Sequence, residues 1–307
     1  MVFMEKNNQT ERREKLNLEN NLPVVESAVY ETVKETEFLR TPGVAVLSVP
    51  NVELSNAKNF LGGFPDELGF DDYFKDTGLL PPAEVLSKFA GQLCYMSFGK
   101  ERTKNDRADS YFKNIMESGH GSVLEHANVS MLFWGVSRSL THELIRHRAG
   151  FAYSQVSQRY VGGKTLRFVE RPEYAADKVL HEKFMERIDV VKEEYEGLTD
   201  YLYQKQAEGV GLLSGERKTD LRKKVRQAAR SVLPNETEAP IIVTGNLRAW
   251  RHFLNMRGSE HAEIEIRNLA VETYRCLCMI APKLFGDFEV EKLSDGTLGL
   301  KTNYPKV

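Results

Sequence analysis

The sequence has only three cysteines, and none of them lies in a recognisable motif. Cys276 and Cys278 are two positions apart, which suits neither a shared helix face nor a common zinc site, and Cys94 is remote from both. The number and spacing of the cysteines do not indicate a disulfide framework. A cysteine nucleophile is not expected either, because no cysteine lies beside a base-like motif. We expect three reduced core thiols, as in a cytoplasmic protein.

The chain also lacks long apolar runs and an excess of charge of one sign. No run reaches the roughly 20 residues that cross a membrane, and the N-terminus has no signal-peptide core, so no membrane partner is expected. The net charge of -2 gives no global basic field, so nucleic acid is not indicated and any anion site must be local. With 41% hydrophobic and 28% charged residues, the 307-residue chain has a globular composition.

Apolar periodicity predicts one α+β domain over residues 21–307, preceded by a polar, disordered arm at residues 1–20. Residues 50–83, rich in Gly, Pro, Asp and Phe, are expected to form an irregular insertion. Strands are expected at residues 43–49, 128–136, 166–169 and 241–243. Helices are expected at residues 84–98, 106–118, 184–202, 217–232, 247–257 and 259–285. From Phe288 the pattern predicts a hairpin that turns at Asp295-Gly296.

Residues 137–160 are the most distinctive stretch. Ser137 or Ser139 can cap a helix, and Gly150 is expected just past its end. The last turn of this helix would then hold three adjacent donors, Arg146, His147 and Arg148. A polar tail follows, with Tyr153, Ser154, Gln155, Ser157, Gln158, Arg159 and Tyr160.

Two interpretations of this stretch remain open. A basic helix end complements the helix dipole, and a polar surface loop can follow it without any function. However, guanidinium groups suit phosphate, because their planar fork meets two oxygens at once. The density of donors up to Tyr160 favours an anion site. Ser157 and Arg159 are expected to point to the same side of an extended chain.

A second polar motif runs from Gly119 to His126. Its glycines allow the backbone to approach a ligand, and Ser122 with Glu125 also fits a capping box that would simply start a helix. The histidines His120 and His126 could be metal ligands. No HExxH pattern is present and their spacing is a weak metal signal, so no metal site is expected.

The third motif runs from Asn246 to Arg267, after the sequence Ala-Arg-Ser-Val-Leu-Pro that contains Arg230. Arg257 and His261 are four positions apart and are expected to share a helix face, which favours a site. Phe253 and Met256 are expected in the core. Glu263 and Arg267 are expected to form an ordinary surface ion pair.

Taken together, these motifs resemble the flavin-dependent thymidylate synthases. Arg-His-Arg from Arg146, followed by Ser157-Gln-Arg-Tyr, is similar to the signature of that family. The spacer between Arg148 and Ser157 has eight residues rather than seven, and we place the extra residue near Ala149-Gly150. The two other motifs are similar to further family elements in the same order, so the resemblance covers about Cys94 to about Met279.

The resemblance implies a mixed or antiparallel sheet with several long helices, a homotetramer, and conversion of dUMP to dTMP. FAD would be the cofactor, with NADPH and methylenetetrahydrofolate as co-substrates. The implied flavin contacts, the last three from a neighbouring subunit, are Ser97, His120, Ser122, Glu125, Arg146, His147, Arg148, Asn246, His252 and His261. The implied dUMP contacts are Glu143, Gln155, Ser157, Arg159, Arg230 and Arg257, with Ser157 and Arg257 as the candidate catalytic residues.

Two alternative functions stay open at this point. One is a flavin-dependent C5-methylase of the same fold that acts on another uridine nucleotide such as UMP, because the spacer is altered. The other is a non-enzymatic nucleotide- or RNA-binding module that uses the arginine clusters. In the favoured reading the arginines hold phosphate and polarise the uracil carbonyls, and no protein nucleophile is required.

Overall fold

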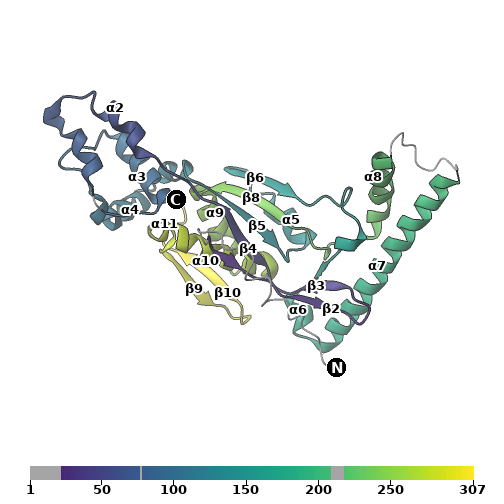
Figure 1. Cartoon of the computed structure of the whole chain (residues 1–307). Coiled ribbons are helices and arrows are strands. Elements are labelled where there is room, and N and C mark those ends of the chain that lie inside the picture. The colour runs from purple at the N-terminus through teal and green to yellow at the C-terminus, as the bar shows by residue number, and fades with distance from the viewer. Residues whose placement is uncertain (1–21, 77, 209–217) are drawn as a thin grey trace, which may run out of the picture.

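The computed structural model describes residues 22–76, 78–208 and 218–307 (Figure 1), and the predicted arm at residues 1–20 lies outside them. Its centre is an antiparallel sheet of five strands, in the order β1-β4-β5-β8-β6. These strands are β1 (Val24–Val25), β4 (Gly43–Ser48), β5 (Asn128–Trp134), β8 (Ile241–Asn246) and β6 (Phe151–Gln155). The predicted α+β class is confirmed.

One face of this sheet is buried because apolar residues alternate along its strands. In β5 the side chains of Val129, Met131 and Phe133 are fully buried. They form one core with residues of α9 (Leu247–Arg257), such as Trp250, and of α10 (Ile264–Ile280), such as Leu269. The sheet therefore holds β6, its edge strand, in a fixed position relative to α9.

A smaller sheet lies at one end of the molecule. It contains β2 (Val29–Glu31), β3 (Glu37–Leu39) and β7 (Phe168–Val169); β2 pairs antiparallel and β7 parallel to β3. It packs on α7 (Lys178–Ala207) through Phe38, Phe168, Phe184 and Ile188. After α6 (Pro172–Ala175), α7 and α8 (Lys218–Ala229) extend away from the central sheet (Figure 1), and η7 (Arg230–Val232) follows α8.

Short helices form the opposite end of the molecule (Figure 1). Residues 54–75 contain η1 (Leu54–Ala57), α2 (Lys58–Leu61), η2 (Asp66–Leu68) and η3 (Phe70–Lys75). They pack on α3 (Pro82–Cys94) and the following loop through Leu61, Phe70, Tyr73 and Phe98. Next come η4 (Asn105–Arg107), α4 (Ala108–Glu117) and η5 (Gly121–Glu125). The division of the chain into arm, domain and insertion stays a prediction.

The C-terminal region contains the predicted hairpin, in which β9 (Phe288–Lys292) pairs with β10 (Leu298–Thr302). Gly296 in its turn has a φ of 83°, a left-handed value that favours glycine. The single helix predicted for residues 259–285 is wrong. Glu263 caps α10 one residue before Ile264, and Pro282 starts the separate helix α11 (Pro282–Phe285), because proline disfavours helical backbone in the residue before it.

Several predicted environments are also wrong. Cys94 is exposed rather than in the core, and Met256 is 52% exposed. Glu263 and Arg267 do not pair with each other; Glu263 accepts from Arg171, whereas the buried Arg267 pairs with Asp295. Long-range contacts decide these positions, and the local sequence does not encode them. In the described ranges, no helix combines the length and the apolarity needed to cross a membrane.

Candidate active site

The Arg146-His147-Arg148 triplet lies beyond a helix, not in its last turn. Ser137 caps α5 (Arg138–Leu144), and its hydroxyl accepts from the Leu140 amide at 3.1 Å as predicted. The helix ends at Leu144, where the amides of Arg146 and His147 donate to the carbonyls three residues back, those of Glu143 and Leu144, instead of four residues back. The single proton of the Tyr153 hydroxyl is shared between the carbonyl oxygens of Leu144 and His147, and Arg257 Nη2 donates to the Glu143 carbonyl at 3.2 Å.

The segment after the triplet is a turn and a strand. Gly150 has a φ of 75°, and a Cβ there would lie 2.8 Å from Asn246 Nδ2 at the start of α9. Glycine is therefore required at this close approach. The chain then continues as β6, which pairs with β8. The placement of the extra spacer residue at this turn stays a prediction.

The triplet lines a pocket of about 600 Å³. The rest of its wall comes from the start of β6 and the last turns of α9: Ala149, Phe151, His252, Met256 and Arg257. Met256 is thus exposed because it faces this pocket. Arg146 and Arg148 are exposed, and no ion pair among the described residues neutralises either charge. The pocket combines free positive charge with an apolar surface.

His147 is held as a neutral ring inside this pocket. Arg257 Nε donates to His147 Nε2 at 2.8 Å, and Arg257 Nη1 donates to Glu143 Oε2 at 2.7 Å. Burial, and after it the charge of Arg257 and the neighbouring His252, together lower the pKa of His147 to about 4. Because Nε2 accepts a hydrogen bond, the proton of the neutral ring is on Nδ1. His147 can therefore donate through Nδ1.

Helix α9 also carries the contact to the Gly119–His126 motif. The predicted capping box is wrong, because no side chain caps η5; instead Glu125 Oε1 accepts from Arg248 Nη1 at 2.6 Å. A Cβ at Gly121 would lie 2.9 Å from Arg248 Nε, so glycine permits this approach. Arg248 and His252 are four positions apart on one face of α9. Arg248 was not predicted as a site residue, although it belongs to the motif that starts at Asn246.

The second cluster lies at the other end of β6. Ser157 to Tyr160 form a turn, in which the Tyr160 amide donates to the Ser157 carbonyl at 3.0 Å and the Arg159 amide donates to Ser157 Oγ at 3.4 Å. The extended chain predicted here is wrong, because the serine hydroxyl bonds to the backbone two residues on. Gln155 is the last residue of β6. Arg159 Nε is buried and has no partner in the described part of the chain.

Helix α8 brings basic side chains to this turn. Lys223 Nζ lies 5.2 Å from the centre of the Tyr160 ring, and Arg226 Nη1 donates to the Tyr160 carbonyl oxygen. Arg230 follows in η7 and is partly buried. The sequence motif predicted Arg230 as a site residue, but it gave no signal for Lys223 and Arg226. On a charged amphipathic helix such residues usually form a solvated face.

Comparison with known proteins identifies the family. Residues 78–283 match the sequence model of the thymidylate synthase complementing protein. The flavin-dependent thymidylate synthase of Mycobacterium tuberculosis is 49% identical over 213 residues, 69% of this chain and 82% of that protein. The Corynebacterium glutamicum protein of that name is 47% identical over 216 residues, 70% of this chain and 83% of its own length. The chain belongs to the flavin-dependent thymidylate synthase family.

The Arg146-His147-Arg148 pocket fits the cofactor of this family. The two exposed guanidinium groups suit the phosphates of FAD. The side chains of Phe151 and Met256 offer an apolar surface to a planar ring system, and neutral His147 offers a donor. The assignment of individual residues to the flavin stays a prediction.

The remaining predicted contacts are scattered in one chain. His252 lies in the triplet pocket, with its ring centre 5.8 Å from that of His147. His261 is 87% exposed and does not share a helix face with Arg257, because α9 ends at Arg257. Ser97, His120 and Ser122 are also exposed, and none of them lines the triplet pocket.

Arg257 lies with the triplet and not with the Ser157 turn. Its guanidinium group bonds to His147 and Glu143 at the start of β6. Ser157, Arg159 and the basic residues of α8 lie beyond the other end of this strand, whose five residues span roughly 17 Å at 3.3 Å per residue. The triplet cluster and the Ser157 cluster therefore lie at opposite ends of β6 within one chain.

Proposed function

We propose that this chain converts dUMP to dTMP, with FAD as its cofactor, methylenetetrahydrofolate as the carbon donor and NADPH as the reductant. The observation that carries the proposal is the pocket around Arg146, His147 and Arg148, in a chain of the flavin-dependent thymidylate synthase family. Free guanidinium groups, a neutral imidazole and apolar side chains match the parts of a flavin nucleotide. When bound, FAD supplies hydride transfer, which no side chain can provide.

On the flavin side, Arg146 and Arg148 bind phosphate, and His147 donates through Nδ1. Arg257 and Glu143 fix the orientation and the tautomer of His147, because the imidazole must accept at Nε2. Further flavin contacts come from Ser97, His120, Ser122, Glu125, Asn246, His252 and His261.

On the nucleotide side, the basic residues around the Ser157 turn bind phosphate, and Gln155 reaches the base. Ser157 acts by binding and not as a nucleophile, because no base stands beside it. Arginine contacts to the uracil carbonyls draw charge onto them, so that C6 accepts hydride and C5 reacts as a nucleophile. Burial raises the pKa of Cys276 to about 11, which makes this thiol a poor alternative nucleophile.

The active site is composite and the enzyme is a homotetramer in this proposal. The flavin half-site and the nucleotide half-site lie at opposite ends of β6, although flavin and dUMP must meet for reaction. A second subunit can place its nucleotide half-site against the flavin half-site of the first. We also assign the enzyme to the cytoplasm, because its three cysteines are free thiols.

The absorption spectrum of the purified protein tests the cofactor. Wild-type protein should show a flavin band, and it should oxidise NADPH and form dTMP from dUMP but not from UMP. Arg148→Ala and His147→Ala should each lower the FAD content. Arg275→Ala is the control, because Arg275 lies on α10 outside the pocket and pairs with Glu272 on the surface. Full FAD content in both pocket variants would refute the flavin assignment.

Arg257→Ala tests the link between the two half-sites. In the composite site proposed here, Arg257 reaches the phosphate of a dUMP molecule held by the nucleotide half-site of a second subunit. Loss of that charge-assisted contact should raise the apparent dUMP constant about ten- to a hundredfold. Saturation curves for dUMP and the FAD content of the same preparation are measured together. A variant that loses FAD and still binds dUMP normally would restrict Arg257 to the flavin half-site, where its bond to His147 already lies.

A further inference from the structure

Residues 54–76 lie outside the stretch that matches the family, which starts at residue 78. They are nevertheless packed tightly against the loop that follows α3. Leu61, Phe70 and Tyr73 share a buried cluster with Phe98, and the rings of Tyr73 and Phe98 are 5.2 Å apart. Phe98 is the immediate neighbour of Ser97, the predicted flavin contact.

The turn that carries Ser97 has an unusual backbone. The Met96 amide donates to the Leu93 carbonyl at 3.1 Å, and the Ser97 amide donates to the Gln92 carbonyl at 2.9 Å. This pair of bonds closes a helix through a left-handed residue, which is usually glycine. Here the left-handed residue is Met96, with a φ of 48°. Such a conformation persists only where its surroundings hold it in place.

Gln92 connects this turn to residues 54–76. Its Oε1 accepts from the Tyr73 hydroxyl at 3.0 Å, and its Nε2 donates to the Thr103 carbonyl at 3.3 Å. Its own carbonyl also accepts from Ser97 Oγ at 3.3 Å. Gln92 is 1% exposed and Tyr73 is 6% exposed, so water cannot easily replace either partner.

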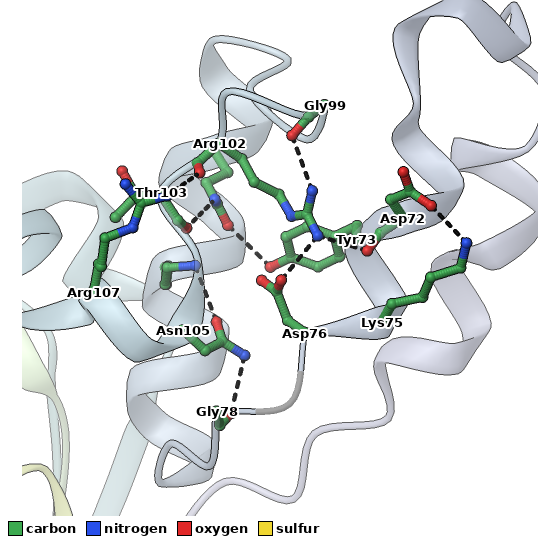
Figure 2. A network of polar contacts seen from close by, with 12 residues as sticks. Asp72, Tyr73, Lys75, Asp76, Gly78, Gly99, Arg102, Thr103, Asn105 and Arg107 are labelled. Atoms are coloured by element: carbon green, nitrogen blue, oxygen red, sulfur yellow. Dashed lines mark hydrogen bonds and ion pairs between the residues drawn. The ribbon is translucent and has the colours of Figure 1, made fainter.

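An ion pair holds the far side of the same loop (Figure 2). Arg102 Nη1 donates to the Gly99 carbonyl at 3.0 Å, while its Nη2 donates to the Asp72 carbonyl at 2.6 Å and to Asp76 Oδ1 at 2.8 Å. Both side chains of the Arg102–Asp76 pair are 5% exposed. Removal of one partner would leave a buried charge without compensation.

We propose that residues 54–76 position the Met96–Ser97 turn for flavin binding, through the Tyr73–Gln92 hydrogen bond and the Asp76–Arg102 ion pair. The inference rests on the proposed function, in which Ser97 contacts FAD. Tyr73, Gln92, Asp76 and Arg102 are positioning residues that act through Ser97 and do not touch the flavin.

A double-mutant cycle on FAD affinity tests the proposal, with Tyr73→Phe and Ser97→Ala as its single variants. Tyr73→Phe removes one buried hydrogen bond and keeps the ring, so it should weaken FAD binding about two- to tenfold. In the Ser97→Ala background the same change should have no further effect, because Tyr73 acts through Ser97. FAD is titrated into the full-length apoprotein and its fluorescence is measured. Equal weakening in both backgrounds, or no weakening, would overturn the proposal.

Two further variants separate positioning from general damage. Lys75→Ala is the matched control, because Lys75 lies on η3 beside Tyr73 and pairs only at the surface with Asp72; its FAD affinity should equal that of wild type. Asp76→Asn should reproduce the Tyr73→Phe pattern, and it replaces Tyr73→Phe if that variant does not fold.

Arg148→Ala, measured in the same titration, distinguishes this inference from the proposed function. Weaker FAD binding in Arg148→Ala together with wild-type affinity in Tyr73→Phe and Asp76→Asn would overturn the positioning role alone. Wild-type protein that binds no FAD would overturn the proposed function and this inference with it. Hydrogen exchange at the amides from Ser97 to Arg102 should be faster in Tyr73→Phe than in Lys75→Ala.

Discussion

His147 shows how a single side chain obtains a fixed protonation state. Its ring is partly buried, its Nε2 accepts from Arg257, and its pKa falls to about 4. Histidine is ordinarily half protonated near pH 6.5. The same residue in a solvated loop would change charge in the range where most enzymes work. Here it remains a neutral donor throughout that range.

Acid should therefore remove stability through His147. Between pH 6.5 and pH 4 the unfolded chain binds the proton and the folded chain does not, so the free energy of unfolding falls as the pH is lowered. His147→Gln should make the pH dependence of urea unfolding shallower in this window. An unchanged slope would mean that His147 titrates normally.

Met96 has a left-handed backbone conformation, which residues other than glycine disfavour. Its φ of 48° is strained for any side chain with a Cβ, and glycine adopts it without strain. Met96→Gly and Met96→Ala lose the same packing, so their difference isolates the backbone. We expect Met96→Gly to be more stable than Met96→Ala by about 1 kcal/mol. Thermal unfolding of the two proteins measures this difference, and equal stability would show that the turn relaxes.

At the scale of elements, the Glu265 side chain links the N-terminus of α10 to the N-terminus of α5 by hydrogen bonds. It lies in the first turn of α10 and accepts from the Ser137 amide and hydroxyl, both at 2.7 Å. Ser137 is also the cap of α5, the helix that carries Glu143 and leads into the triplet. The pKa of Glu265 is raised to about 7, chiefly by burial. The hydrogen bonds from Ser137 oppose this rise, Glu263 adds to it, and Arg171 opposes it.

Stability should fall through Glu265 as the pH rises. Between pH 4.5 and pH 7 the folded chain binds the proton and the unfolded chain does not, so the free energy of unfolding decreases with rising pH in this window. The sign is opposite to that for His147. Glu265→Gln should abolish this component, which is seen as the difference between the pH profiles of the variant and of wild type. Parallel profiles from pH 4.5 to pH 7 would contradict the raised pKa.

At the scale of the whole molecule, β6 separates the two halves of the proposed active site. The triplet pocket is at its start, and the Ser157 turn with the basic residues of α8 is at its end. β6 is hydrogen-bonded to β8 along its whole length. Bending of this paired strand is therefore a poor route to bring the halves together, and in the proposed tetramer a second subunit would supply the missing half.

Mixing two inactive chains tests this arrangement. Arg148→Ala damages the flavin half-site and Arg159→Ala damages the nucleotide half-site, so a mixed oligomer can contain one intact composite site. Activity should reappear in verified mixed oligomers, up to a fraction set by random assembly, and neither variant alone should regain it. Mixed oligomers without activity would point to self-contained sites.

The sequence by itself determined most elements and the family. The cap at Ser137, the bounds of α9, the central strands β4, β5 and β8 and the C-terminal hairpin were predicted from local patterns. The central strands β1 and β6 were not predicted. Caps, turns and periodicity are properties of neighbouring residues, so they are encoded within a few positions. The motifs around Arg146, Ser157 and Asn246 are also local in the sequence, and the resemblance to the family could therefore be recognised from them.

Only the tertiary structure decided which side chains meet. The triplet lies beyond its helix, where Tyr153 and Arg257 bond to the carbonyls of Leu144 and Glu143. Arg257 bonds to His147 and not to Ser157. Lys223 lies beside the Tyr160 ring because α8 packs next to the Ser157 turn, although the two residues are far apart in the chain. Residues 54–76 acquired a contact to the Ser97 turn through the buried amide of Gln92. These partners are far apart in the chain, and packing, which depends on the whole core, selects among them.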